Sequence, residues 1–292
     1  MNLLHGSIKF FSPGVRMSAL ALLGDLAKYA PSTIAAGFGE LVTVAITCAT
    51  DFKNPMACNN ALWSIGEMCK KCQGSEGGRS TVEPYAERLV GVLKAFILGG
   101  TNTNGLVFPN GILENASVTL GRLAAVDPRY LSNVVEKEGF VGLWSVGLLK
   151  NIGDVWEKAD GYNGLLACLG GGRLGAVLNG DNCGPSNVSG LLIAISGWHV
   201  CPNYKEGGEG DEGGGLSECT IAVLHSVNYM FREFPVSIGG GGEVPVLVEL
   251  RGNLRSLVLE VMKLCGEVEW AKLKNRLPKN VLRLLEEQYP VI

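Results

Sequence analysis

The sequence predicts an all-α protein, built from stacked pairs of antiparallel helices with glycine-rich insertions. The first observation is a phrase that occurs three times: a small polar residue, then Ala, then an aliphatic residue followed by Gly and a charge. Residues 18–25, 60–67 and 115–122 carry this phrase. The three Gly residues lie 42 and 55 residues apart, and polar insertions at 73–80 and 99–105 lengthen the second interval. A period of about 40 to 47 residues is typical of HEAT-type helical repeats.

The second observation is apolar residues at helical spacing. Leu20, Leu23 and Leu26 recur every third residue, which predicts a helix over 15–30 that ends before Pro31. The same reasoning predicts further helices over 32–50, 55–72, 81–98, 109–126, 128–151, 188–200, 216–234, 243–265 and 278–289. We therefore expect one array of about five helical pairs over residues 1–292, which is a right-handed HEAT-repeat α-solenoid.

The third observation is glycine concentrated in three segments, 170–190, 205–215 and 239–242. Glycine supplies no side chain to bury, and ordering its backbone costs more entropy than ordering any other residue. We expect these segments to be flexible loops inserted between helices.

Composition excludes several classes of function. The net charge is −3 and the longest Lys/Arg run is the pair Lys70-Lys71, so no footprint for nucleic acid is present. The nine cysteines are scattered, which favours reduced thiols in the cytosol or nucleus. Residues 1–14 are too interrupted for a secretory signal, and the apolar stretch 188–200 is too short to span a bilayer. We expect neither membrane nor nucleic acid as a partner.

The sequence contains no complete motif for catalysis or for binding a cofactor. Cys69 and Cys72 have CxxC spacing, but no second pair or nearby His completes a metal site, so we interpret them as two helical cysteines. Residues 170–175 fit GxGxxG, yet their surroundings predict helical repeats without the βαβ unit that a dinucleotide loop needs. The three histidines lack a Ser or Cys partner in a recognisable motif. We expect no enzyme activity, no cofactor and no metal.

Trp63 is the most informative single residue. Asn59, Trp63 and Glu67 are spaced by four and share one helix face, with Asn60 beside them. A large ring next to amide and carboxylate groups can hold an extended peptide: the ring covers apolar side chains while Asn bonds the peptide backbone. The alternative is that Trp63 packs between helices and Asn bonds a neighbouring loop. Periodicity alone favours this alternative, because apolar helix positions are usually core.

Two segments, 59–67 and 113–123, closely resemble the C-terminal HEAT repeats of the transportin (karyopherin-β2) family of importin-β-type receptors. The resemblance extends to residues 15–28, to Trp144 with Asn151-Ile152, and to Asn253-Leu254-Arg255, Trp270 and Leu277-Pro278. It is strong from 15 to 151, weak from 161 to 242 and intermediate afterwards. Transportins are nuclear import receptors that bind an extended cargo signal on the concave face of their superhelix.

The resemblance implies that this chain is the cargo-binding part of such a receptor, recognising nuclear localisation signals of the PY type. It favours the peptide-binding interpretation of Trp63. The expected cargo surface comprises Asp25, Asn59, Asn60, Trp63, Glu67, Asn115 and Val118. Asp25 would meet basic cargo residues, while Trp63 and Val118 would seat apolar ones. The alternatives are a solvated carboxylate for Asp25 and an ordinary helix-face amide for Asn115.

The resemblance also implies partners and location. In the family, the GTPase Ran binds N-terminal repeats, which are absent here, so Ran contact is expected only through those repeats. Nucleoporins are a further expected partner, and the protein should shuttle between cytoplasm and nucleus. The rival interpretation is a structural HEAT scaffold, or a truncated fragment without transport activity of its own. In that case exposed apolar surface at residues 1–23 would favour self-association.

Overall fold

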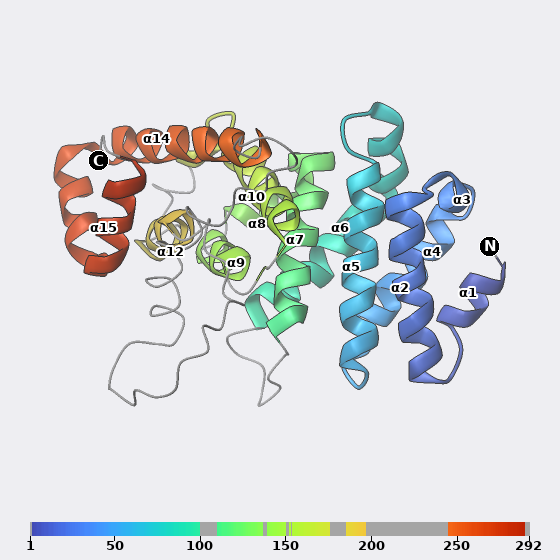
Figure 1. Ribbon diagram of the computed structural model, residues 1–292. Helices are drawn as coiled ribbons and strands as arrows, with labels where there is room; N and C mark the ends of the chain where they lie inside the picture. Colours follow the sequence, from blue (N-terminus) through green and yellow to red (C-terminus); the bar gives the residue numbers. More distant parts are fainter. Residues whose placement is uncertain are drawn as a thin grey trace, which may run out of the picture. The chain divides into compact units, whose positions relative to one another are not determined.

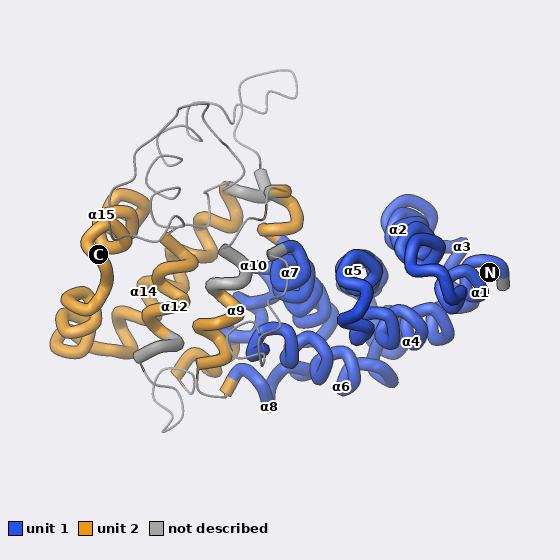
Figure 2. Tube along the Cα trace, turned by 90° about the horizontal axis from the view of Figure 1, so that it is seen from below, with its two compact units in different colours: residues 1–135, 160–170 blue, residues 136–159, 171–292 orange. Residues whose placement is uncertain are grey.

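The computed structural model describes residues 2–99, 110–136, 139–149, 152, 154–175, 185–196 and 245–289. All regular structure within these ranges is helical, which confirms the predicted all-α class. The chain divides into two compact units: residues 1–135 with 160–170, and residues 136–159 with 171–292 (Figure 2). Each unit is described by itself below. Whether they form one continuous array stays a prediction.

The first unit is a two-layered stack of helices. Its helices are α1 (Asn2–Ile8), α2 (Pro13–Tyr29), α3 (Ser32–Ala35), α4 (Phe38–Ala49), α5 (Pro55–Lys71), α6 (Glu76–Gly99), α7 (Asn110–Val126), the 3₁₀ helix η1 (Pro128–Leu131), α8 (Ser132–Val135) and the end of α10 (Val155–Leu169). Helices α2, α5 and α7 lie side by side in one layer, and α4 and α6 form the other (Figures 1 and 2). Helices α4 and α5, which are consecutive along the chain, contact one another.

The helices of the first layer match their predictions within about two residues, because proline marks their ends. Pro13 and Pro55 stand at the first helical position of α2 and α5, where a missing N–H costs nothing. Pro31 follows the end of α2. These fixed starts and stops explain why periodicity located α2 and α5 accurately.

Three predicted boundaries are corrected. The helix expected over 32–50 is divided into α3 and α4. The main-chain N–H of Gly37 donates to the Ile34 oxygen in a turn, and Gly37 is then the N-cap of α4. The segment 73–80, expected to be an insertion, begins α6 at Glu76. The helix expected over 128–151 is η1, α8 and α9 (Phe140–Leu149), since Gly139 takes a left-handed φ of 73° that no helix continues through.

The repeated Gly positions are where neighbouring helices approach most closely. A Cβ at Gly24 would overlap the Trp63 ring, and one at Gly66 would lie 2.5 Å from the Thr119 hydroxyl. At Gly121 a Cβ would lie 2.6 Å from the Gly161 backbone. The constant Gly of each phrase therefore admits the next helix of the stack.

The second unit contains α9, the first turn of α10, α12 (Pro185–Ser196), α14 (Pro245–Arg276) and α15 (Lys279–Gln288). Helix α12 packs on α9 and contacts α14 and α15. Helix α14 is kinked at Gly266, whose φ is 70°. Part of the expected insertion 170–190 is helical, since residues 185–190 open α12. The insertions 205–215 and 239–242 and the helix predicted over 216–234 lie outside the described residues.

Candidate functional site

The ring of Trp63 lies between α2 and α5, with part of its surface still accessible. It is of intermediate exposure, and its six-membered ring rests on Gly24 of α2. Only a residue without Cβ leaves room for the ring there. The ring therefore packs between helices, as the second sequence interpretation has it, and its intermediate exposure leaves peptide binding a prediction.

The three asparagines make two different hydrogen bonds between helices. Asn115 of α7 donates from Nδ2 to Oδ1 of Asn59 on α5, at 2.9 Å, and both residues are half-exposed. Asn60 instead donates to the main-chain oxygen of Met17 at 3.0 Å, which ties α5 to α2. The structure thus brings Asn59 and Asn115 together at an accessible position, and gives Asn60 a role in holding the helices.

Asp25 is exposed on α2, one residue beyond the glycine on which Trp63 rests. A solvated carboxylate at this position can meet a basic group of a ligand, mainly by guiding its approach.

Glu67 and Val118 lie inside the stack rather than on its surface. Val118 is 2% exposed and Glu67 is 1% exposed. The Glu67 carboxylate pairs with Nη1 of Arg122 at 2.9 Å. The burial of both side chains leaves them no direct contact with a ligand in this arrangement, so they can act only by supporting the surface above them.

The ion pair continues into a network that the sequence did not indicate. Arg122 Nε donates to Asp160 of α10 at 3.0 Å, and Lys70 Nζ donates to the same carboxylate oxygen at 2.7 Å. Two acidic and two basic groups therefore neutralise one another across α5, α7 and α10. Sequence reasoning missed Asp160 because it lies in a helix that was not predicted; acidic spacing along α10 offered no signal by itself.

The two cysteines of the CxxC spacing lie at the end of α5, with Cys69 in the helix and Cys72 at its C-cap. Cys69 and Cys72 are free and buried, and desolvation raises the pKa of the Cys69 thiol to about 12. A thiol held neutral at physiological pH is a poor nucleophile and metal ligand. No cluster of potential metal ligands occurs among the residues the structure describes.

The GxGxxG match is also explained by the fold. The residues before Gly170 are the end of helix α10, not a strand, and Gly171 and Gly172 have φ of 66° and 85° in the turn that follows. A helix in this place has none of the βαβ geometry of a dinucleotide site.

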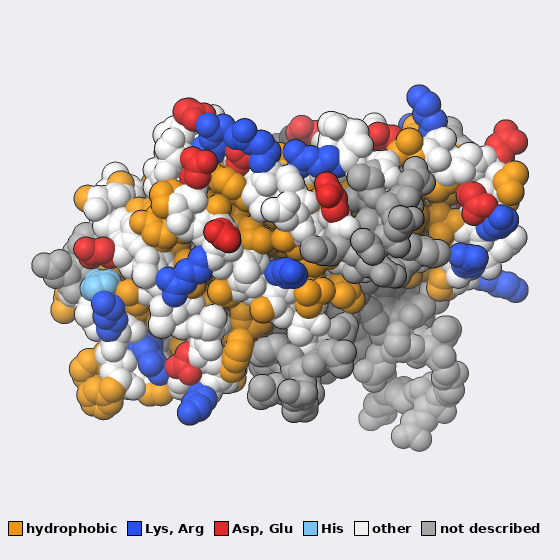
Figure 3. All heavy atoms as spheres, turned by 180° about the vertical axis from the view of Figure 1, so that it is seen from behind, with side chains coloured by type: hydrophobic (Ala, Val, Ile, Leu, Met, Phe, Trp, Pro, Cys, Tyr) orange, Lys and Arg blue, Asp and Glu red, His pale blue; other side chains and the backbone are white. Residues whose placement is uncertain are grey.

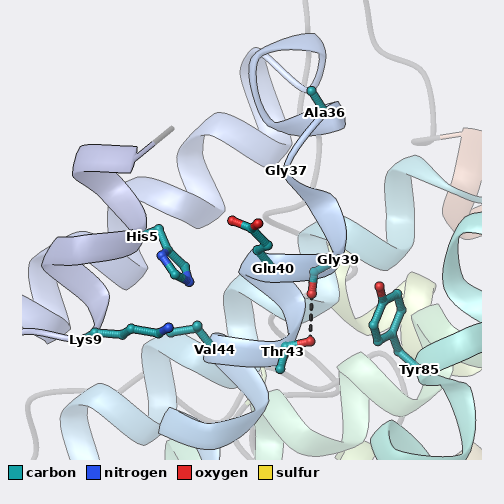
Figure 4. Close-up of a pocket in the computed structure, with 9 residues that line it drawn as sticks. All are labelled: His5, Lys9, Ala36, Gly37, Gly39, Glu40, Thr43, Val44 and Tyr85. Atoms are coloured by element: carbon teal, nitrogen blue, oxygen red, sulfur yellow. Dashed lines mark hydrogen bonds between the residues drawn. The ribbon is translucent and has the colours of Figure 1, made fainter.

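A polar hollow of about 630 Å³ lies elsewhere in the first unit, between α1, α4 and α6 (Figure 4). His5, Lys9, Glu40 and Tyr85 are among the residues that line it, and the Thr43 hydroxyl donates to the Gly39 oxygen at 2.7 Å. None of the candidate residues lines this hollow. It belongs with the α4 and α6 layer, whereas Trp63 lies in the α2, α5 and α7 layer.

The surface carries both signs of charge. On the face in Figure 3, Lys and Arg side chains are interspersed with Asp and Glu, which agrees with the net charge of −3. Among the described helices, none combines the length and apolarity needed to cross a bilayer.

Comparison with known proteins identifies relatives of this chain. No family model matches it. It is 32% identical to rice (Oryza sativa) transportin-1 over 217 residues, which cover 66% of this chain and 23% of that protein. It is 32% identical to the importin subunit beta-2 of Schizosaccharomyces pombe over 160 residues, 53% of this chain and 16% of the relative. Human transportin-1 is 29% identical over 172 residues, 58% of this chain and 17% of the relative.

These relatives agree with the family resemblance noted in the sequence, and their names are those of transport proteins rather than enzymes, as expected for a chain without catalytic motifs. The chain spans less than a quarter of the length of each of these relatives. The protein is therefore a distant homologue of the transportin and importin beta-2 proteins.

Proposed function

We propose that this chain is the cargo-binding part of a transportin-like nuclear import receptor, and that it holds an extended nuclear localisation signal. The proposed architecture is a HEAT-type solenoid. The parallel course of α5 and α7 supports it, because contacts advance together along both helices, from Asn59–Asn115 to Glu67–Arg122. Stacked repeats place equivalent residues side by side in this way.

The observation that carries the proposal is the group formed by Trp63, the Asn59–Asn115 amide pair and Asp25. An extended peptide has main-chain N–H and C=O groups without internal partners, and side-chain amides can bond both. The accessible part of the indole offers apolar and cation–π contact to neighbouring side chains. Asp25 adds a carboxylate for basic cargo residues.

The remaining candidate residues support this surface from beneath. Asn60 fixes α5 to α2 through Met17, and Glu67 fixes it to α7 through Arg122. Val118 fills the core of the stack. Their substitution should change binding through the position of Trp63 and Asn59, rather than by removing a contact with the peptide.

The homology supports a proposal about partners. We propose PY-type nuclear localisation signals as the cargo and nucleoporins as a further partner, with Ran contacting only repeats outside this sequence. Such a receptor shuttles between cytoplasm and nucleus.

A structural role is the second candidate, and a specific observation favours it. Leu3 and Phe11 are 85% and 83% exposed near the start of the stack. Where such side chains gather into a contiguous patch, they mark a surface that another protein covers. A HEAT scaffold or a fragment without transport activity of its own would present such a surface.

Calorimetric titration of the full chain with a basic PY-type peptide tests the proposal. We expect saturable binding that Trp63→Ala weakens at least about tenfold, which is a loss typical of a central aromatic residue. Trp156→Ala is the matched control, because Trp156 is a 51% exposed tryptophan that belongs to the second unit. Thermal melts of both variants establish that they remain folded.

Two outcomes would contradict the proposal. The first is absence of saturable binding by the wild-type chain, which would favour the structural role. The second is an equal loss of affinity in the Trp63 and Trp156 variants, which would show that the peptide does not recognise the Trp63 surface.

A further inference from the structure

A second cavity of the first unit, of about 330 Å³, is lined by residues of α3, α4, α5 and α6 and of the turns beside them. Three of its lining residues, Ile34, Met68 and Cys72, are only 3%, 1% and 8% exposed. Pro31, Ala35 and Phe38 add further apolar surface. The volume lies at the lower end of the range of about 300–1,000 Å³ that is typical of small-molecule sites. An alkyl chain of moderate length would suit both the lining and the volume.

The cavity lies between two successive connections of the stack, from α2 to α4 and from α5 to α6. Its lining begins at Pro31 and ends at Thr81, so both walls come from within the described helices. A Cβ at Gly78 would lie 2.1 Å from the main-chain oxygen of Cys72. Glycine at this position therefore lets the first turn of α6 lie against the end of α5 and close one side of the cavity.

The polar residues of the lining are exposed and carry one kind of charge. They are Ser32, Lys71, Ser75 and Thr81, and no Asp or Glu occurs among the described residues that line the cavity. The main-chain N–H of Gly78 donates to Oγ of Ser75 at 3.0 Å, so the positive end of the α6 dipole lies at the same place. Glu76, the acidic residue of this first turn, pairs with Arg79. The opening of the cavity therefore favours an anionic group.

We propose that this cavity binds a medium-chain fatty acid, with the alkyl chain against Ile34, Met68 and Cys72 and the carboxylate near Lys71. Apolar lining stabilises a chain that leaves water, and the ammonium group attracts the carboxylate. Inorganic phosphate would gain nothing from the apolar residues, and an alkane would gain nothing from Lys71. The proposal goes beyond the cargo function, because none of the candidate cargo residues lines the cavity.

Calorimetric titration of the full chain with octanoate at neutral pH tests the proposal. We expect saturable binding of one octanoate per chain. Hexanoate should bind about tenfold more weakly, because it buries two fewer CH₂ groups. Acetate, which has the carboxylate without the chain, should show no saturable binding.

Two pairs of variants locate the ligand. Ala35→Leu should abolish octanoate binding by occupying the cavity, whereas Ala36→Leu, outside the lining, should leave it unchanged. Lys71→Gln should weaken binding about two- to fivefold, as expected for an exposed ion pair, and Lys53→Gln should not. All four residues are exposed, so circular dichroism should show unchanged helix content.

The Cys72 thiol gives a direct readout of occupancy. Saturating octanoate should slow the alkylation of Cys72 by iodoacetamide severalfold, because the chain covers the thiol. Cys265 is the control, since it is a free cysteine of intermediate exposure in the second unit, and its rate should not change. Peptide mapping by mass spectrometry measures both rates.

The proposal is overturned if the wild-type chain shows no saturable octanoate binding, or if octanoate leaves the Cys72 rate unchanged. It is equally overturned if Ala35→Leu and Ala36→Leu have the same effect. Protection of Cys72 by a peptide with a C-terminal leucine, and not by octanoate, would assign the cavity to a protein terminus instead. Each of these results leaves the cargo proposal intact, since that is measured by peptide binding through Trp63.

Discussion

Arg122 and Glu67 occupy equivalent positions of successive repeats, and they form an ion pair of 2.9 Å with each side chain 2% exposed. In α5 and α7 the charged residue that follows the repeated Gly is thus buried in the stack, whereas Asp25 of α2 is exposed. Asp160 completes the charge balance from α10. Buried charges are tolerated only when they are paired. Helices α5, α7 and α10 must therefore pack together so that their charged side chains neutralise one another.

Arg122→Met is expected to destabilise the first unit by about 3–5 kcal/mol, since it removes the guanidinium that pairs with both the buried Glu67 carboxylate and the Asp160 carboxylate. Urea unfolding followed by circular dichroism measures the loss. Adding Glu67→Gln should recover part of it, because one uncompensated charge is removed. Strict additivity of the two losses would show that the residues do not interact energetically.

Gly121→Ala should lower the free energy of unfolding by about 1–3 kcal/mol, because the new methyl group would lie against the backbone of Gly161, which cannot rotate away. Gly91→Ala is the control. Nothing lies within 4 Å of its added Cβ in α6, so it should instead gain about 0.5–1 kcal/mol from higher helix propensity. Equal effects from the two substitutions would contradict close packing at Gly121.

Burial raises the pKa of the Cys58 and Cys69 thiols to about 12. Unfolded cysteine ionises near pH 8.5, so keeping these thiols neutral contributes stability below that pH, and the contribution is lost as pH rises towards 12. In the folded protein at pH 9, iodoacetamide should modify both slowly. Peptide mapping by mass spectrometry, with urea-unfolded protein as control, measures the protection. Equal rates in both samples would refute it.

The hydrogen bond from the Arg129 side chain lowers the pKa of Asp127 more than burial raises it. Because the folded pKa lies below the unfolded value of about 3.9, the stabilisation is present above that pH and lost as pH falls through the folded pKa. Asp127→Asn should therefore flatten the decline in stability below about pH 4. Unfolding midpoints measured from pH 2.5 to 6 test this, and an unchanged acid slope would contradict it.

The helices that sequence predicted accurately are those with strong local signals. Helices α2 and α5 have proline at the first position and regular apolar spacing. Helix α10 was missed because Gly161 and Gly164 weaken its local pattern. In the structure those same glycines make room for the close backbone contact with Gly121. Glycine is thus unfavourable for α10 as an isolated helix, but the close packing of α10 against α7 requires it.

For the candidate surface, too, the sequence predicted some features and only the structure decided others. Sequence singled out Trp63, Asn59, Asn115 and Asp25, and the structure leaves all four at least partly exposed. Spacing along α5 could not show that Glu67 turns inward. Four-residue spacing places residues on one face of a helix, but that face is wide enough to include both an open edge and a buried one.

The sequence by itself determined the all-α class, the repeat, the positions of the principal helices and the homology, because propensity, proline and periodicity act within a few turns of chain. Only the tertiary structure decided which members of each repeat are buried and which remain accessible. That outcome depends on the adjacent helix: Arg122 neutralises Glu67, and Gly24 admits Trp63. Burial and charge compensation are properties of pairs of helices, and one repeat alone does not contain them.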